Sequence, residues 1–259
     1  SAKVVLLESI RMDSLNAEAH MLLGKILKDN GEIEEAHEHM ATAVSLDPAN
    51  LDYQLTLGTL LFNMGKTAQA IAYLESAVKI NKWNFSAHYN LGHALIREGR
   101  QKKGEKFLDV ADNLQKVNAR IGFLRTNLRS KPKNLSDWIK LGYLLQSIEN
   151  YDEAFQVFKI VSFLSPENLD IRDNIAFLSL ALTDTIGAIK EYRHILKRDP
   201  TRANTWFNVG VIYASIGKLE AAEQAWKKTL EQNPSDTTAA KLIERLSKID
   251  ITSIFEPLH

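Results

Sequence analysis

The sequence predicts an all-α protein, a solenoid of stacked helical hairpins in two blocks joined by a long helix. Large apolar residues recur at intervals of three and four, which places them on one face of a helix. The 259 residues contain only 12 glycines and 6 prolines, fewer than the many turns of an all-β fold require. A similar string of residues also returns with a period of 34. Its central small residues are Gly24, Gly58 and Gly92, then Gly142, Ala176 and Gly210.

Each central small residue is followed at fixed distances by the residues of a second helix. A second small residue comes twelve positions later: Ala36, Ala70, Gly104, Ala154, Ala188 or Ala222. A large apolar residue comes four positions after that: Met40, Leu74, Leu108, Phe158, Tyr192 or Trp226. One such hairpin cannot bury its own apolar face, so the units must stack.

Glycine and proline mark the ends of the predicted helices. A glycine that can adopt positive φ ends the first helix of four units, at Gly31, Gly65, Gly99 and Gly217. Proline stops the second helix because it lacks an N–H and restricts the residue before it. Four units close in this way, at Pro48, Pro166, Pro200 and Pro234.

The pattern resembles the tetratricopeptide repeat (TPR) family. The signature spacing is matched by Trp138, Leu141, Gly142, Leu145, Ala154, Phe158 and Pro166, and again by Trp206, Val209, Gly210, Tyr213, Ala222, Trp226 and Pro234. The resemblance implies a right-handed superhelix whose concave surface is lined by the first helix of each repeat. The repeat from residue 169 departs most, because Ala176 replaces the first glycine and Ser179 replaces an aromatic residue or leucine. We expect Trp206 and Trp226 to be packing residues.

The register divides the chain into successive segments. We expect residues 1–16 to form the second helix of a partial repeat, as in a fragment of a longer protein or in a chain whose first helix is atypical. Three repeats follow over 17–118, and a long connecting helix over 101–134 overlaps the third. Three further repeats occupy 135–236. A capping helix covers 237–250, with Ala240, Ile243 and Leu246 on one face, and a tail covers 251–259.

The long connecting helix follows from a break in the period. Gly92 and Gly142 are 50 residues apart, sixteen more than one period, yet apolar residues continue at helical spacing. We expect one helix over 101–130; the alternative is a break near Asn118 or Gly122 that creates an extra half-repeat. The added stretch carries basic residues and no acid. It is either a solvated helix face or a patch for an acidic or phosphorylated partner. Its basic residues are Arg120, Arg125, Arg129, Lys131 and Lys133.

The first helices of the repeats supply the candidate binding groove. Asn90, Asn174 and Asn208 stand two positions before the central small residue in three repeats. Each amide both donates and accepts a hydrogen bond, so the three suit the backbone of an extended peptide. The alternative is that they bridge neighbouring helices within the stack. Apolar pockets around them are expected from Leu55, Phe62, Tyr89, Tyr143, Phe177 and Phe207.

Composition excludes several classes of partner. Basic and acidic residues both total 32, so the formal net charge is zero. Nucleic-acid-binding domains normally carry a net basic surface, and we therefore expect no nucleic-acid partner. The longest apolar runs are far below the roughly 18 residues of a membrane span, so direct membrane insertion is not expected. The chain has no cysteine, which excludes disulfides and thiolate metal sites.

No arrangement of residues predicts catalysis. His37 and His39 are two positions apart, and His88 and His93 are five apart. Neither pair has the four-residue spacing that presents two imidazoles to one metal ion on a helix. No nucleophile, base and oxyanion donor occur together. We therefore predict no enzyme, no metal site and no cofactor.

The sequence favours a non-catalytic scaffold that binds a peptide or partner protein in the concave groove and assembles a complex. One alternative is a targeting or substrate-recruitment module of a longer enzyme. Another is self-assembly into a homo-oligomer. The surfaces for this would be the N-terminal edge, where Val5, Leu6 and Ile10 are expected to be exposed, or the tail around Phe255. The compartment stays open between cytoplasm and periplasm.

Overall fold

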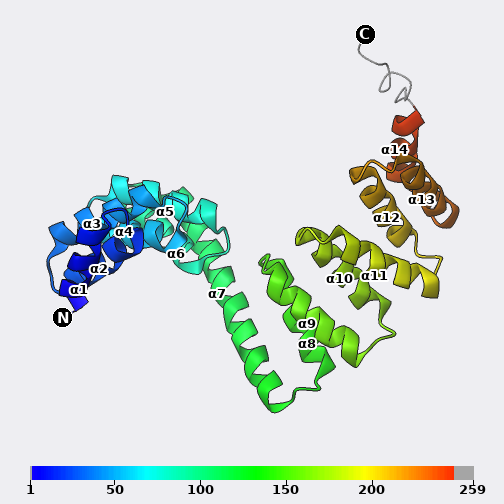
Figure 1. Ribbon diagram of the computed structural model, residues 1–259, viewed down its shortest axis with the longest axis horizontal. Helices are drawn as coiled ribbons and strands as arrows, with labels where there is room; N and C mark the ends of the chain where they lie inside the picture. Colours follow the sequence, from blue (N-terminus) through cyan, green and yellow to red (C-terminus); the bar gives the residue numbers. More distant parts are fainter. Residues whose placement is uncertain (1, 248–259) are drawn as a thin grey trace, which may run out of the picture. The chain divides into compact units, whose positions relative to one another are not determined.

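The computed structural model describes residues 2–247, which form fourteen α-helices and no β-strand (Figure 1). The all-α fold class predicted from the 34-residue period is therefore confirmed. The helices are α1 (Ala2–Met12), α2 (Ala17–Asp29), α3 (Ile33–Leu46), α4 (Leu51–Asn63), α5 (Thr67–Ile80), α6 (Phe85–Arg97), α7 (Gln101–Ser130), α8 (Leu135–Ser147), α9 (Tyr151–Leu164), α10 (Leu169–Ala181), α11 (Thr185–Arg198), α12 (Ala203–Ser215), α13 (Leu219–Gln232) and α14 (Thr237–Ser247).

The helices pair as hairpins, and we call the two helices of each repeat its A helix and its B helix. The A helices are α2, α4, α6, α8, α10 and α12. Each B helix other than α7 packs against its own A helix and against the helix that follows it. The helix α1 packs against α2 in the manner of a B helix, and α14 packs against α13. Every helix in these contacts therefore buries an apolar stripe on a neighbour along the chain.

The central small residue of each A helix allows the close approach within a hairpin. A Cβ atom added at Gly142 would lie 2.7 Å from the ring of Phe158, which is completely buried. Gly24 meets Met40 and Gly58 meets Leu74 in the same way. The 34-residue period thus reflects the packing of one small residue against one large residue in each repeat.

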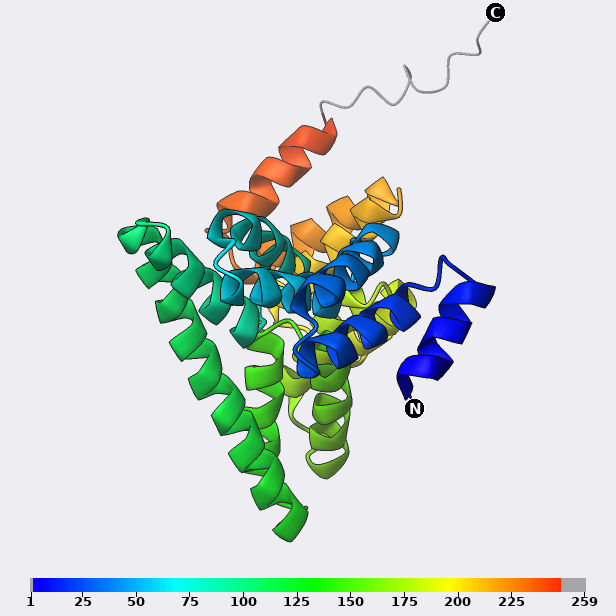
Figure 2. The same cartoon turned by 90° about the vertical axis from the view of Figure 1, so that its left-hand side faces the viewer.

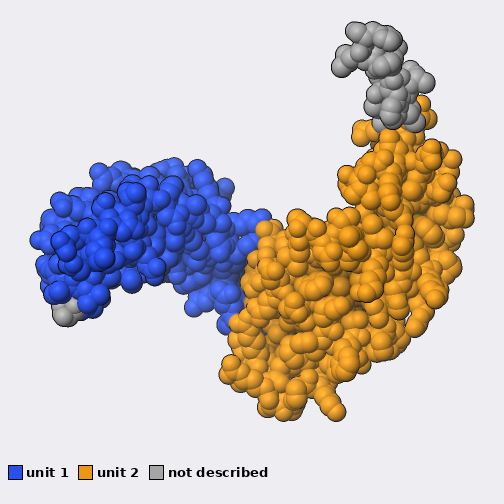
Figure 3. Space-filling model, viewed as in Figure 1, with its two compact units in different colours: residues 1–120 blue, residues 121–259 orange. Residues whose placement is uncertain are grey.

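The chain forms two compact units, residues 1–120 and residues 121–259 (Figure 3). The division falls inside α7, which is one uninterrupted helix with no break at Asn118 or Gly122 (Figure 2). Its buried residues keep the predicted helical spacing: Ala111, Leu114, Ile121, Leu124 and Leu128. The predicted long helix between the two blocks is confirmed.

The fourth position of five repeats anchors the turn that precedes the A helix. In five repeats a side-chain nitrogen at this position donates to the backbone carbonyl six residues earlier, at 2.8 to 3.4 Å. In the first repeat His20 instead faces His39, with 3.0 Å between their Nδ1 atoms, and burial lowers the pKa of His39. The five donors are Gln54, His88, Trp138, Arg172 and Trp206. The position thus requires a nitrogen donor of sufficient reach rather than one residue type.

Asparagine caps five of the six A helices. In each case its side-chain oxygen accepts a hydrogen bond from a backbone N–H of the first turn. The capping residues are Asn16, Asn50, Asn84, Asn134 and Asn168. The exception is α12, where Arg202 stands at the capping position and makes no side-chain cap.

The turns within the repeats require a left-handed residue, and two of them lack glycine. Gly31, Gly65, Gly99 and Gly217 have φ between 76° and 84°, as predicted. The corresponding residues of the fourth and fifth repeats are Glu149, with φ 55°, and Thr183, with φ 64°. A residue with a Cβ atom pays roughly 1–2 kcal/mol in this conformation. These two turns are therefore strained.

Replacing Thr183 with glycine should relieve this strain. We expect Thr183→Gly to raise the free energy of unfolding by about 0.5–1 kcal/mol. This is less than the full strain, because the greater freedom of glycine in the unfolded chain offsets part of it. Gly217→Thr, the reverse change in the next repeat, should lower it by about 1–2 kcal/mol. Urea denaturation followed by circular dichroism measures both. If both variants changed the free energy of unfolding equally and in the same direction, Thr183 would not be strained.

Two details at the ends differ from the expected apolar faces. In α1 the side chains of Leu6 and Ile10 are half-buried against the core of unit 1, whereas Val4, Val5 and Leu7 are exposed. Leu6 and Ile10 were thus wrongly expected to be exposed, because α2 covers them. In α14 it is Ala239, rather than Ala240, that is buried. The tail over 251–259, with Phe255, lies outside the described residues.

Candidate peptide-binding surface

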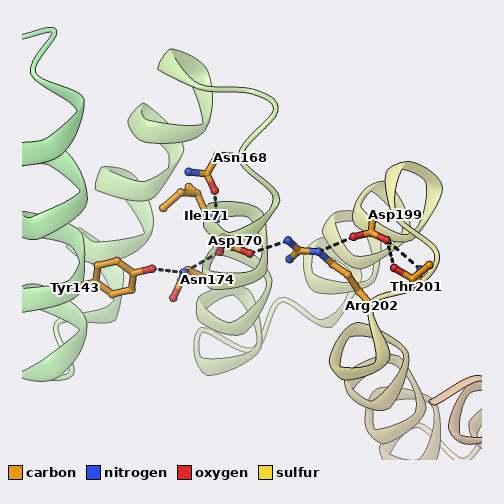
Figure 4. A network of polar contacts seen from close by, with 8 residues as sticks. All are labelled: Tyr143, Asn168, Asp170, Ile171, Asn174, Asp199, Thr201 and Arg202. Carbon is orange, nitrogen blue, oxygen red and sulfur yellow. Dashed lines mark hydrogen bonds and ion pairs between the residues drawn. The ribbon is translucent and has the colours of Figure 1, made fainter. Parts of the chain in front are cut away.

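Two of the three groove asparagines bond to neighbouring helices. Asn90 Nδ2 donates to Thr59 Oγ1 at 2.9 Å, joining α6 to α4. Asn174 Nδ2 donates to the Tyr143 hydroxyl at 3.1 Å, joining α10 to α8, and to the Asp170 carbonyl at 2.8 Å (Figure 4). These bonds are the ones expected if the asparagines bridge helices within the stack.

Asn208 faces Tyr192 of α11, and its amide opposes the rise that burial gives to the pKa of the Tyr192 hydroxyl. All three asparagines are only half-buried, so each keeps part of its amide at the surface. Contact of these amides with a peptide stays a prediction.

In unit 1 the predicted apolar residues are partly covered. Phe62 is half-buried beneath the guanidinium of Arg97, which lies 5.1 Å from its ring centre and donates to its carbonyl at 3.1 Å. Leu55 is half-buried against the core of this unit. Tyr89 is exposed and contacts the ring of His93, with 4.4 Å between their centres. Of these residues only Tyr89 presents a large open apolar face.

In unit 2 an apolar side chain is exposed at the same position of three successive A helices. Tyr143, Phe177 and Val211 are each the ninth residue of their repeat, and their exposed fractions are 46%, 45% and 43%. We call these three residues the apolar ladder. The sequence reasoning identified two of them and missed Val211. The predicted Phe207 is instead half-buried in the cluster around Trp226.

A charged network joins Asp170 of α10 to the turn between α11 and α12 (Figure 4). The Arg202 guanidinium lies 2.8 Å from Asp170 Oδ1 and 3.3 Å from Asp199 Oδ2. Asp199 also accepts from the hydroxyl and the backbone N–H of Thr201, at 2.6 and 3.1 Å. The guanidinium of Arg202 is thus already paired with two carboxylates.

A cavity of about 340 Å³ lies beside this network and is lined by Asp170, Asp173, Arg202 and the first turn of α12. Asp173 Oδ1 is buried and has no hydrogen-bond partner. Burial raises the pKa of the Asp173 carboxyl, although Arg202 acts in the opposite direction. Nothing in the sequence points to this aspartate, because the burial of its Oδ1 depends on the packing of two repeats.

The basic segment of α7 and the following turn is less cationic than its sequence implies. Arg125 Nη2 lies 2.6 and 2.7 Å from the two carboxylate oxygens of Glu153 in α9, so its charge is paired. Arg120, Arg129, Lys131 and Lys133 are exposed. Contact of the five basic residues with an acidic partner stays a prediction.

No helix among residues 2–247 is both long enough and apolar enough to cross a bilayer.

The stacked hairpins and the exposed faces of their A helices define an α-helical repeat protein. Family models described as tetratricopeptide repeat match residues 17–50, 61–128 and 180–237. The chain belongs to the tetratricopeptide repeat family.

Curated relatives match smaller parts of the chain. The general transcriptional corepressor ssn6 of Schizosaccharomyces pombe is 24% identical over 110 residues, which are 42% of this chain and 10% of that protein. Protein bimA of Emericella nidulans is 26% identical over 99 residues, 38% of this chain and 12% of that protein. The chain thus spans about a tenth of the length of these relatives.

Among solved structures, YrrB is described as a TPR protein with an unusual peptide-binding site. It is 17% identical, with a TM-score of 0.43, and the match covers 79% of this chain and 97% of that one.

Proposed function

We propose that this chain is a non-catalytic scaffold that binds an extended peptide, or an extended segment of a partner protein, along its A helices. TPR stacks act in general as protein-interaction scaffolds, because successive A helices form a continuous surface. A complex is assembled when a partner held on this surface is brought to other proteins. The proposal assigns the chain no catalytic chemistry.

The apolar ladder is the observation that carries the proposal. Three side chains at equivalent positions, Tyr143, Phe177 and Val211, each leave more than 40% of their surface open to water. An extended peptide running across the repeats can place apolar side chains against them, and burial contributes about 25 cal/mol per Å² of apolar surface. The half-buried amides of Asn174 and Asn208 stand three positions earlier on α10 and α12, where they suit a peptide backbone.

Placing a charge in the ladder should abolish binding. A library of short random peptides is selected on the full chain, and the enriched peptides are synthesised and titrated by fluorescence anisotropy. We expect Phe177→Asp to weaken their binding at least about tenfold, because truncating a buried aromatic contact costs 2 kcal/mol or more. The matched control is Phe163→Asp on α9, whose side chain is 85% exposed on another helix.

The two variants give a clear decision. Normal binding by Phe163→Asp and weak binding by Phe177→Asp would support the proposal. Equal binding by both variants, or a library without any binding peptide, would contradict it. Circular dichroism of the two variants checks that both have the helical content of the unmodified chain.

A further inference from the structure

We infer that unit 2 carries a pocket for an organic cation, built around Asp173 between α10 and α12, which binds an arginine or lysine side chain of the peptide held on the apolar ladder. The inference rests on the proposed function and adds the chemical class of the partner: a peptide with a basic residue beside apolar ones.

The Asp173 carboxylate has one oxygen without a hydrogen-bond partner. Asp173 lines the cavity of about 340 Å³, and its Oδ1 is buried and accepts no hydrogen bond. A buried carboxylate oxygen that accepts no hydrogen bond is costly, and an ionised partner with N–H donors satisfies it best. Guanidinium and ammonium groups supply such donors.

The neighbouring Arg202 is already bonded to two other carboxylates. Arg202 bonds to Asp170 and Asp199, so it contributes only a longer-range attraction to Asp173. Burial and then the Asp173 carboxylate raise the pKa of Tyr192. The Asp173 carboxylate thus has no direct ion pair with Arg202, the one cationic residue among the described residues that line the cavity.

The charges around the cavity indicate the class of ligand. An anion is disfavoured, because two carboxylates line the cavity and its one guanidinium is already bonded. A metal ion is disfavoured as well, since the described residues contain no group of three or more side chains suited to hold one. An organic cation fits both observations.

The carboxylates of the pocket and Phe177 of the ladder lie on the same face of α10. Asp173 and Phe177 are four residues apart on α10, and Asp170 is three residues before Asp173. Residues with these spacings lie on the same helix face, one turn after another. Buried residues of α10, such as Ile171, Ile175 and Leu178, occupy the opposite face. One peptide can therefore contact Phe177 and reach Asp173 with its next side chains.

The test uses the same peptide selection on the full chain. Peptides whose binding Phe177→Asp weakens should contain an arginine or lysine. Replacing that residue with glutamine should weaken binding to the unmodified chain at least about tenfold, because hydrogen bonds to charged groups have this magnitude. On the Asp173→Asn variant the same peptide change should have little effect. The matched control is Asp152→Asn on α9, which removes one exposed carboxylate away from the cavity.

The outcomes separate this inference from the proposed function. Peptides that depend on Phe177 but contain no basic residue would overturn the pocket and leave the scaffold proposal intact. The same follows if glutamine replacement weakens binding equally to the unmodified chain and to Asp173→Asn. A selection without Phe177-dependent peptides would overturn both. If Asp173→Asn folds poorly, unchanged binding of the glutamine peptide to the unmodified chain would still overturn the pocket.

Discussion

Replacing Trp226 with alanine is expected to lower the free energy of unfolding of the last repeat by about 3–5 kcal/mol. Only 3% of this side chain is exposed, and its Nε1 donates to the Phe207 carbonyl at 3.3 Å. Its indole fills the space left by Gly210, and it belongs to the cluster that holds Ala239 of α14. The loss should remain local, because repeat stacks are stabilised by contacts between neighbours.

Trp206→Ala serves as the comparison for this variant. Trp206 was expected to be a packing residue of equal importance, but it is half-buried and donates to the Pro200 carbonyl at 2.9 Å. We expect a cost of about 1–3 kcal/mol for Trp206→Ala. Urea denaturation gives both values, and hydrogen exchange should show the Trp226→Ala loss in α12 to α14. Equal costs for the two tryptophans would contradict this description of the last repeat.

Alanine at Gly104 should destabilise unit 1, although alanine occupies the equivalent position in each of the other five repeats. A Cβ atom at Gly104 would lie 2.6 Å from the Gly92 carbonyl oxygen and 2.6 Å from Ile96 Cγ1. A backbone atom cannot move aside as the end of a flexible side chain can, so α6 and α7 must separate. Overpacking of this kind costs typically 1–3 kcal/mol.

Gly122→Ala provides the matched control in the same helix. A Cβ atom at Gly122 meets no heavy atom within 4 Å, so alanine should stabilise α7 by about 0.5–1 kcal/mol. Both changes bring the same gain in helix propensity, so the difference of about 1–3 kcal/mol between their unfolding free energies measures the clash alone. If the denaturation curves of the two variants coincided, α6 and α7 would not be held at this close distance.

The period of 34 allowed the hairpins to be predicted because the contacts that form them are local. Gly142 and Phe158 are sixteen residues apart, so a repeated small and large pair is visible in the sequence. The left-handed turns at Glu149 and Thr183 were not predictable, since neither residue type signals positive φ. The donors at the fourth position were not predictable from the sequence either, because four different residue types make the same hydrogen bond.

The candidate site was predictable only in part. Equivalent positions in successive A helices led to Tyr143, Phe177 and the asparagines. The hydrogen bonds of Asn90 and Asn174 depend on a different acceptor in each repeat, Thr59 and Tyr143, so no periodic signal shows them. Asp173 and the ion pair of Arg125 with Glu153 depend on packing between helices, which spacing along one helix does not reveal.

The tryptophans are unevenly divided between the two units. Of the four in the chain, Trp83 belongs to unit 1, whereas Trp138, Trp206 and Trp226 belong to unit 2. Intrinsic fluorescence therefore reports mainly on unit 2, while circular dichroism reports on the helices of both. Following the two signals through one denaturation curve shows whether the units unfold together or in sequence, without an attached dye. Because the chain has no cysteine, a single introduced thiol can then label either unit alone.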